Sequence, residues 1–261
     1  MYDFHLHLTR LPHSKEVASL LKQAGTSYNN IACEPWEWEK SLEMGETRAF
    51  GIHPMIATKV SEGEWGRLIE ILKQHPNAQV GECGLDKRFD DYEPGGVQEQ
   101  VFRRQAQLAK ELGRTLHIHC VGDYLRVVEI LEAVGFGGGN TAAGTATGTA
   151  IETAASSATQ VVFHRFGGDI SAAKAILKAF GDRAIFSLHV DSFRKKSTAA
   201  AIKEIPQTRV RFETDADESF VMIPAGTSAE TKSTDSIAAS TVANQIQNRL
   251  MQVVALYNSA V

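Results

Sequence analysis

Residues 97–134, VQEQVFRRQAQLAKELGRTLHIHCVGDYLRVVEILEAV, contain the alternation that decides the fold. The first part, Gln98–Leu112, places its apolar residues at helical spacing. The run Thr115–Cys120 is short and mostly apolar, and a second helical pattern follows over Asp123–Val134. A strand set between two helices in this way is typical of an α/β protein with a parallel sheet.

The same alternation extends in both directions along the chain. We expect eight strands, at Tyr2–Leu8, Asn30–Cys33, Arg48–His53, Ala78–Glu82, Thr115–Cys120, Gln160–His164, Ala184–His189 and Arg209–Thr214. The clearest helices are expected at Ser14–Gln23, Glu64–Lys73, Gln98–Leu112, Asp123–Val134 and Ser171–Phe180, with a last one at Val242–Tyr257. Eight such units in about 250 residues predict one closed, TIM-like (β/α)8 barrel domain over residues 1–261. The alternative is an open, doubly wound sheet, which requires no eight-fold count.

The composition is that of an ordinary globular protein. The 261 residues are 43% hydrophobic and 22% charged, and the net charge of −4 excludes a strongly basic nucleic-acid coat protein. The three cysteines, Cys33, Cys83 and Cys120, are too few and too widely spaced for a disulfide framework. No signal peptide or apolar run of membrane-spanning length is evident. We therefore expect a cytoplasmic protein without a membrane partner, or a nuclear one in a eukaryote.

One segment interrupts the pattern of strands and helices. Residues 137–160 are almost entirely Gly, Ala and Thr, and Glu152 is the single charged residue among them. Such a composition buries little apolar surface, so we expect a flexible insertion. It joins a helix to the next strand, which in a barrel places it on the face opposite the catalytic one.

Histidine recurs at the end of the first expected strand. His5 and His7 are two residues apart, so strand alternation turns both side chains to one face. Two imidazoles placed in this way at the carboxyl end of a barrel strand can hold a metal ion. A pair of this kind alone is weak evidence, because structural histidine pairs are common.

Five further side chains occupy the corresponding position on other strands. They are His53, Glu82, His119, His164 and Asp215. Isolated polar groups at such positions are costly, so their convergence favours one shared metal site over separate structural roles. Together with His5 and His7, these side chains are more ligands than a single tetrahedral ion requires. They fit two divalent ions with one carboxylate bridging them. Imidazole and carboxylate ligands suit zinc, manganese or iron, and magnesium less well.

At these residues the chain resembles the TatD family of metal-dependent hydrolases, among the amidohydrolase-like barrels. The resemblance rests on Asp3-Phe4-His5-Leu6-His7-Leu8, Gly51-Ile52-His53-Pro54, Gly81-Glu82-x-Gly84-Leu85-Asp86, Ile118-His119-Cys120, His164-x-Phe166-x-Gly168 and Glu213-Thr214-Asp215. Lys87-Arg88-Phe89 and Trp38-Glu39 look most like the Cut9-interacting-protein branch of that family.

The resemblance implies a metal-dependent deoxyribonuclease that binds DNA or another phosphodiester transiently. It assigns His5, His7 and Asp215 to one ion and His119 and His164 to the other. Glu82 would bridge the two ions, Asp215 would also orient or deprotonate the attacking water, and His53 would stabilise the scissile group.

The residues that contact substrate are less clearly marked. Lys87 and Arg88 directly follow the glutamate motif and are the best candidates to bind phosphate, although other basic residues, including Arg10 and Arg165, also follow strands. Val121 stands where the resembled family usually has Arg. Two alternatives therefore stay open: a catalytically impaired barrel that acts as a binding or adaptor protein, and a hydrolase of esters or amides.

Overall fold

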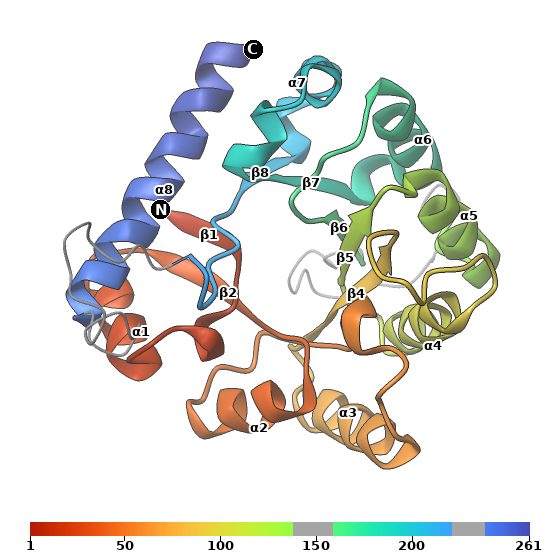
Figure 1. The fold of residues 1–261 in the computed structure, drawn as a ribbon, viewed down its shortest axis with the longest axis horizontal. Helices are drawn as coiled ribbons and strands as arrows, with labels where there is room; N and C mark the ends of the chain where they lie inside the picture. The colour runs from red at the N-terminus through yellow and green to blue at the C-terminus, as the bar shows by residue number, and fades with distance from the viewer. Residues whose placement is uncertain (138–158, 221–237) are drawn as a thin grey trace, which may run out of the picture.

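Eight parallel strands in sequential order form the centre of the molecule, as the strand count predicted. The computed structural model describes residues 1–137, 159–220 and 238–261. The strands are β1 (Tyr2–Leu6), β2 (Ser27–Ala32), β3 (Ala49–Phe50), β4 (Gln79–Asp86), β5 (Leu116–Val121), β6 (Val161–Phe163), β7 (Ala184–Leu188) and β8 (Val210–Phe212). The expectation of a TIM-like barrel is confirmed, because each strand pairs in parallel with the next and the helices surround them (Figure 1).

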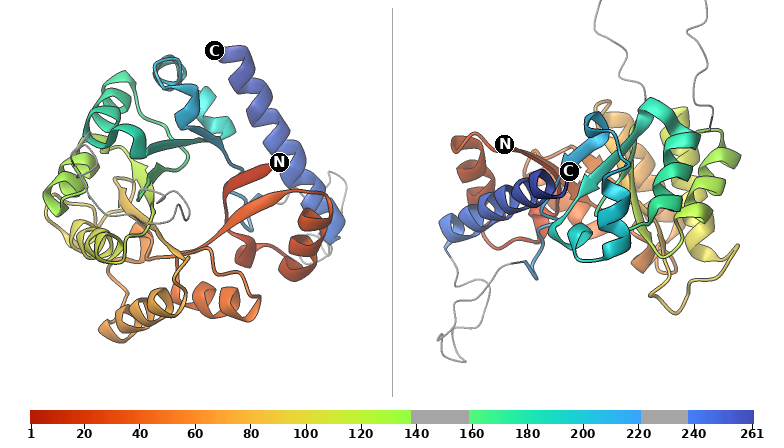
Figure 2. Two further views of the ribbon diagram at one scale, coloured as in Figure 1. Left: turned by 180° about the vertical axis from the view of Figure 1, so that it is seen from behind. Right: turned by 90° about the horizontal axis from the view of Figure 1, so that it is seen from above.

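A ring of helices covers the outside of the strands (Figures 1 and 2). The helices are α1 (Ser14–Gln23), α2 (Pro35–Glu43), α3 (Glu62–Gln74), α4 (Val97–Glu111), α5 (Tyr124–Val134), α6 (Ile170–Phe180), α7 (Lys196–Ile202) and α8 (Ala239–Ala260). The main hydrophobic core fills the space between the sheet and helices α2 to α7, and the C-terminal part of α8 also contributes to it. A second core lies beneath α1 and α8, and Figure 1 shows these two helices side by side. None of the helices in the described ranges is long and apolar enough to cross a bilayer.

The barrel closes where β8 meets β1, and side-chain bonds supplement the backbone there. The His7 amide donates to the Ala216 carbonyl at 2.8 Å, and the Asp215 amide donates to the His5 carbonyl at 2.9 Å. Asp3 accepts from the amide of Thr214 at 3.0 Å and from its hydroxyl at 2.6 Å. The closing seam therefore carries three residues that the sequence assigned to the metal site, namely His5, His7 and Asp215.

β4 corrects one expected boundary. We expected this strand to end at Glu82, but it continues to Asp86, with a register shift between Val80 and Cys83. Gly84 makes the extension possible, because a Cβ there would lie 1.9 Å from the His119 carbonyl oxygen. The irregularity turns Glu82 into the barrel while the strand goes on pairing with β5.

Candidate metal centre

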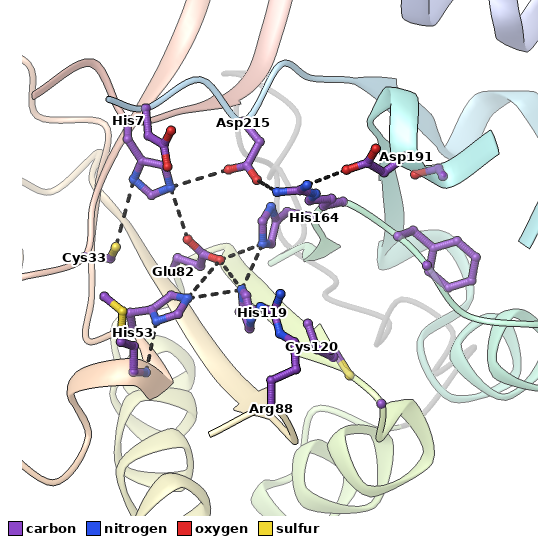
Figure 3. A pocket seen from close by; sticks show the side chains of 18 of the residues that line it. His7, Cys33, His53, Glu82, Arg88, His119, Cys120, His164, Asp191 and Asp215 are labelled. Atoms are coloured by element: carbon purple, nitrogen blue, oxygen red, sulfur yellow. Dashed lines mark hydrogen bonds and ion pairs between the residues drawn. The ribbon is translucent and has the colours of Figure 1, made fainter. Parts of the chain in front are cut away.

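The seven predicted side chains meet at the end of the barrel where the strands finish. Figure 3 shows all of them except His5. Each is placed by its strand or by the residues directly after it: β1 provides His5 and His7, β3 His53, β4 Glu82, β5 His119, β6 His164 and β8 Asp215. They lie at one end of the barrel because parallel strands all finish at the same edge of their sheet. All except His5 line a cavity of about 380 Å³ among the described residues.

Glu82 lies at the centre of this group, and its two oxygens face different histidines. Oε2 is 3.4 Å from the Nε2 atom of His5 and 3.4 Å from that of His7. Oε1 is 2.5 Å from His119 Nδ1 and 2.6 Å from His164 Nε2. Each oxygen of one carboxylate thus has its own pair of imidazoles.

Asp215 completes the group on the Oε2 side of Glu82. Its Oδ1 atom is 3.9 Å from His5 Nε2 and 3.6 Å from His7 Nε2. Burial alone would raise the pKa of Asp215, but the hydrogen bond with His7 and the charges of nearby histidines hold that pKa below its usual value. Asp215 is therefore an ionised carboxylate beside two imidazole nitrogens.

The nitrogen and oxygen atoms of these side chains are better placed to bind a cation than to satisfy one another by hydrogen bonds. Nε2 of His5 is buried without a hydrogen-bond partner in the described part of the chain. Nδ1 of His119 lies 3.2 Å from His53 Nε2 and 3.3 Å from His164 Nε2, so three imidazoles converge on one point. Ligand atoms of the triads His5–His7–Asp215 and His5–Glu82–His164 lie within 4.8 Å of one another. Such convergence of nitrogen and oxygen donors is the arrangement that a transition-metal ion requires.

Partners behind the histidines fix which nitrogen faces the site. Nδ1 of His7 lies 3.1 Å from the Ile31 carbonyl, which leaves Nε2 turned inward. On the other side, His119 Nε2 lies 2.9 Å from Asp86 Oδ2, and Nδ1 faces Glu82. Partners of this kind orient metal-binding histidines and set their tautomers.

His53 differs from the other histidines of the metal centre in its hydrogen bonding. Its Nδ1 accepts the Met55 amide hydrogen at 3.0 Å, so the neutral ring carries its proton on Nε2. That nitrogen lies 3.7 Å from Glu82 Oε1. Burial and the neighbouring His119 lower the pKa of His53 to about 3, so the ring is neutral. His53 thus offers an N–H donor to the cavity.

The two predicted substrate contacts lie in different surroundings. Nζ of Lys87 lies 2.9 Å from Asp123, and Lys87 is not among the described residues that line the cavity. Arg88 lines the cavity, but its guanidinium is bonded to both oxygens of the buried Asp86, with Nε 2.9 Å from Oδ1. Arg88 is therefore linked through Asp86 to His119. That either residue binds phosphate stays a prediction.

Sequence reasoning missed the contacts made by Asp191. This residue follows β7 and pairs with Arg165, which in turn contacts Asp215 at 2.7 Å. No strand-end pattern marks Asp191, because it lies in a short helical turn after the strand. Its position two residues beyond the strand-ending His189 was the only available signal.

The fold and the site together define a class of protein: metal-dependent hydrolases built on a (β/α)8 barrel. The chain belongs to the TatD related DNase family, whose model matches residues 2–247. The Bacillus subtilis protein YabD, named an uncharacterized metal-dependent hydrolase, is 25% identical over 82% of this chain and 79% of its own length. The human 3'-5' RNA nuclease TATDN2 is 29% identical over 69% of this chain but only 21% of its own length.

Two further similar proteins bear on the branch of the family and on the fold. The Cut9-interacting protein scn1 of Schizosaccharomyces pombe is 28% identical over 44% of this chain and 47% of its own length, in line with the resemblance noted in the sequence. The crystal structure of YjjV, a TatD homologue from Escherichia coli, superposes with a TM-score of 0.66 and 21% identity. That comparison covers 98% of this chain and 97% of the other.

Proposed function

We propose that this protein hydrolyses phosphodiester bonds in DNA with two divalent metal ions that share Glu82. The observation that carries the proposal is the pairing of each Glu82 oxygen with its own two imidazoles. Both oxygens of Glu82, four histidines and Asp215 are more ligands than one tetrahedral ion takes, whereas two ions sharing one carboxylate could use them all. The family description and the nuclease relative supply the class of substrate.

The residues divide into two ligand sets. His5, His7 and Asp215 would hold one ion, and His119 with His164 would hold the other. A donor set of four imidazoles and two carboxylates favours zinc or manganese over magnesium. When bound, the two ions would supply positive charge at the phosphoryl oxygens and lower the pKa of a water molecule.

The protein groups account for the remaining steps of hydrolysis. Oxygen from water forms a bond to phosphorus as the bond from phosphorus to the leaving oxygen breaks, and the leaving oxygen takes up a proton from the solvent. Asp215 would accept the proton of the attacking water, because its carboxylate lies beside the proposed ligand His7. His53 presents Nε2–H to the cavity, where it can donate to a phosphoryl oxygen.

The three cysteines support the proposed cytoplasmic location. Cys33, Cys83 and Cys120 are free thiols and all are buried. Free buried thiols are usual in proteins of reducing compartments.

Metal analysis followed by assays on a panel of substrates tests the proposal. We expect the purified protein to carry two divalent ions and to cleave end-labelled single-stranded DNA. A chelator should abolish cleavage, and zinc or manganese should restore it. Labelled RNA, a nitrophenyl ester and an amide form the comparison set. Cleavage of the ester or amide without cleavage of DNA would replace the proposed substrate class. Full metal occupancy without hydrolysis of any substrate would favour a binding or adaptor protein.

A further inference from the structure

Arg165 has an unusual backbone conformation at the end of β6. It directly follows His164, and its φ is +42°, in the left-handed region that long side chains rarely adopt. Within the described ranges, three non-glycine residues have positive φ, and two of them, Arg165 and Asp215, are bonded to each other. Strain of this kind persists where it places a functional side chain.

The guanidinium of Arg165 donates a hydrogen bond to one of the two oxygens of Asp215. Nη1 donates to Asp215 Oδ2 at 2.7 Å, and Nη2 donates to Asp191 Oδ2. The other oxygen of Asp215 is the one that faces His7. In this arrangement Asp215 has one oxygen turned to the histidines and the other bonded to Arg165, and the positive charge of Arg165 makes the carboxylate a weaker proton acceptor.

Other arginines of the cavity are more firmly committed to their partners. Arg88 makes its hydrogen bonds to Asp86, which is fully buried. Arg10 likewise bonds to Glu37, whose side chain is also inaccessible. Arg165 is 46% exposed, and its contact with Asp215 is a single hydrogen bond from Nη1. Breaking that one bond leaves Nη2 on Asp191, so a change of partner is less costly for Arg165 than for the two arginines that hold inaccessible carboxylates through several bonds.

We propose that Arg165 binds the scissile phosphate and, by changing partner, frees Asp215 to accept the proton. This inference rests on the proposed phosphodiesterase function. The planar guanidinium carries several donors, so it can bond to Asp191 through Nη2 and to a phosphate oxygen through Nη1, and Arg165 lines the same cavity as Glu82 and Asp215. Asp191 retains Nη2 while Nη1 moves from Asp215 to the phosphate. Substrate binding and activation of the proton acceptor are thereby coupled through one side chain.

Inorganic phosphate serves as the probe, titrated calorimetrically into metal-loaded protein. R165Q should weaken phosphate binding and raise KM for single-stranded DNA, each by roughly 10-fold or more, because a charge-assisted contact is lost. R165K, which keeps the charge but not the planar fork, should recover part of both. Metal content should equal that of the unsubstituted protein in each variant.

R194Q is the matched control. Arg194 contacts Oδ1 of the same Asp191 at 2.8 Å, and its side chain is 76% exposed and outside the described cavity lining. Removing this charge should leave phosphate affinity and KM within about two-fold, as expected for an exposed ion pair.

Two results would overturn the inference. If R165Q lost metal while its remaining loaded fraction bound phosphate normally, Arg165 would only brace Asp215. If R165Q and R165K both bound phosphate and DNA normally, Arg165 would have no part in recognition. Failure of the proposed function looks different: the unsubstituted protein would bind phosphate through Arg165 yet cleave no phosphodiester.

Discussion

Glu82 connects the two halves of the site, since its carboxylate contacts histidines from β1, β5 and β6. Glu82→Ala removes both shared oxygens at once. We expect the variant to lose most bound metal and all measurable hydrolysis together, as seen by elemental analysis and a DNA cleavage assay on one preparation.

Glu99→Ala controls for the removal of a buried glutamate. Glu99 lies on α4 and is bonded to Arg126, away from the metal centre. This variant should be less stable but should keep its metal content. Full metal occupancy with normal turnover in Glu82→Ala would show that Glu82 is not a bridge.

A substitution at Asp215 can separate metal binding from proton transfer. Asparagine is nearly isosteric and can still contact an ion through its oxygen, but it cannot take up a proton. Asp215→Asn should keep much of the metal while turnover falls by roughly 10²–10⁴-fold, the usual range for a positioned general base. If Asp215 only braced the barrel seam, melting temperature would fall while turnover per folded molecule stayed near normal.

For single residues, the sequence predicted which side chains converge on the site but not which partners orient them. His53, Glu82 and His164 could be identified because they follow apolar runs at strand ends. Partners such as Arg165 and Asp191 lie after the strands, in a loop and a short helical turn, where no periodicity marks them. Arg165 was recognised only as one basic loop residue, because its contact with Asp215 depends on a left-handed backbone.

Among the secondary-structure elements, α8 is the one that seals the barrel beside β1. Ile246 is fully buried in the core beneath α1 and α8, whereas Met251 on the same helix is 50% exposed. Ile246→Ala should lower the free energy of unfolding by about 2–5 kcal/mol, because it leaves a cavity. Met251→Ala should change it by at most about 0.5 kcal/mol. Urea denaturation of both variants tests this, and equal losses would contradict the assigned packing.

Element boundaries were predicted less well than the elements themselves. α1 was predicted at its observed bounds, but α3 begins at Glu62 rather than at the expected Glu64. Ser61 accepts the Glu64 amide hydrogen, and the Glu64 side chain accepts in return, so the helix starts one residue after Ser61. The short α2 and α7 were not among the clear helices, since seven to nine residues give little periodicity.

For the whole molecule, the seam between β8 and β1 depends on Asp3. This buried carboxylate accepts from Thr214 twice and from the His5 amide at 3.3 Å. Asp3→Ala should reduce the free energy of unfolding by about 2–4 kcal/mol, because buried donors lose their acceptor. Denaturation should be measured with a chelator present, so that metal affinity does not contribute.

The exposed Asp90 provides the control for this charge change. Asp90→Ala should shift stability by no more than about 0.5 kcal/mol. A seam closed mainly by the backbone bonds from His7 and Asp215 would instead leave Asp3→Ala as stable as the control.

The connection between α5 and β6 tests whether the insertion and the metal centre lie at opposite ends of the barrel. Residues 138–158 lie outside the described residues, but both flanks are anchored. Phe136 is buried, and its carbonyl accepts from Arg183, while Gln160 accepts the Leu116 amide hydrogen at 2.9 Å. These contacts lie where β6 begins, whereas His164 follows its other end.

The insertion should therefore be dispensable for chemistry. Replacing residues 138–157 by a short Gly-Ser turn should leave turnover within a few-fold and metal content unchanged. The free energy of unfolding should stay the same or rise slightly, because each halving of a flexible loop lowers the cost of closing it by only about 0.6 kcal/mol. The variant keeps Phe136 and Gln160, so the anchoring contacts survive and any effect comes from the removed segment. If a folded, metal-loaded variant lost most of its turnover on DNA, the segment would have to reach the strand-end face, and its predicted place opposite the metal centre would be wrong.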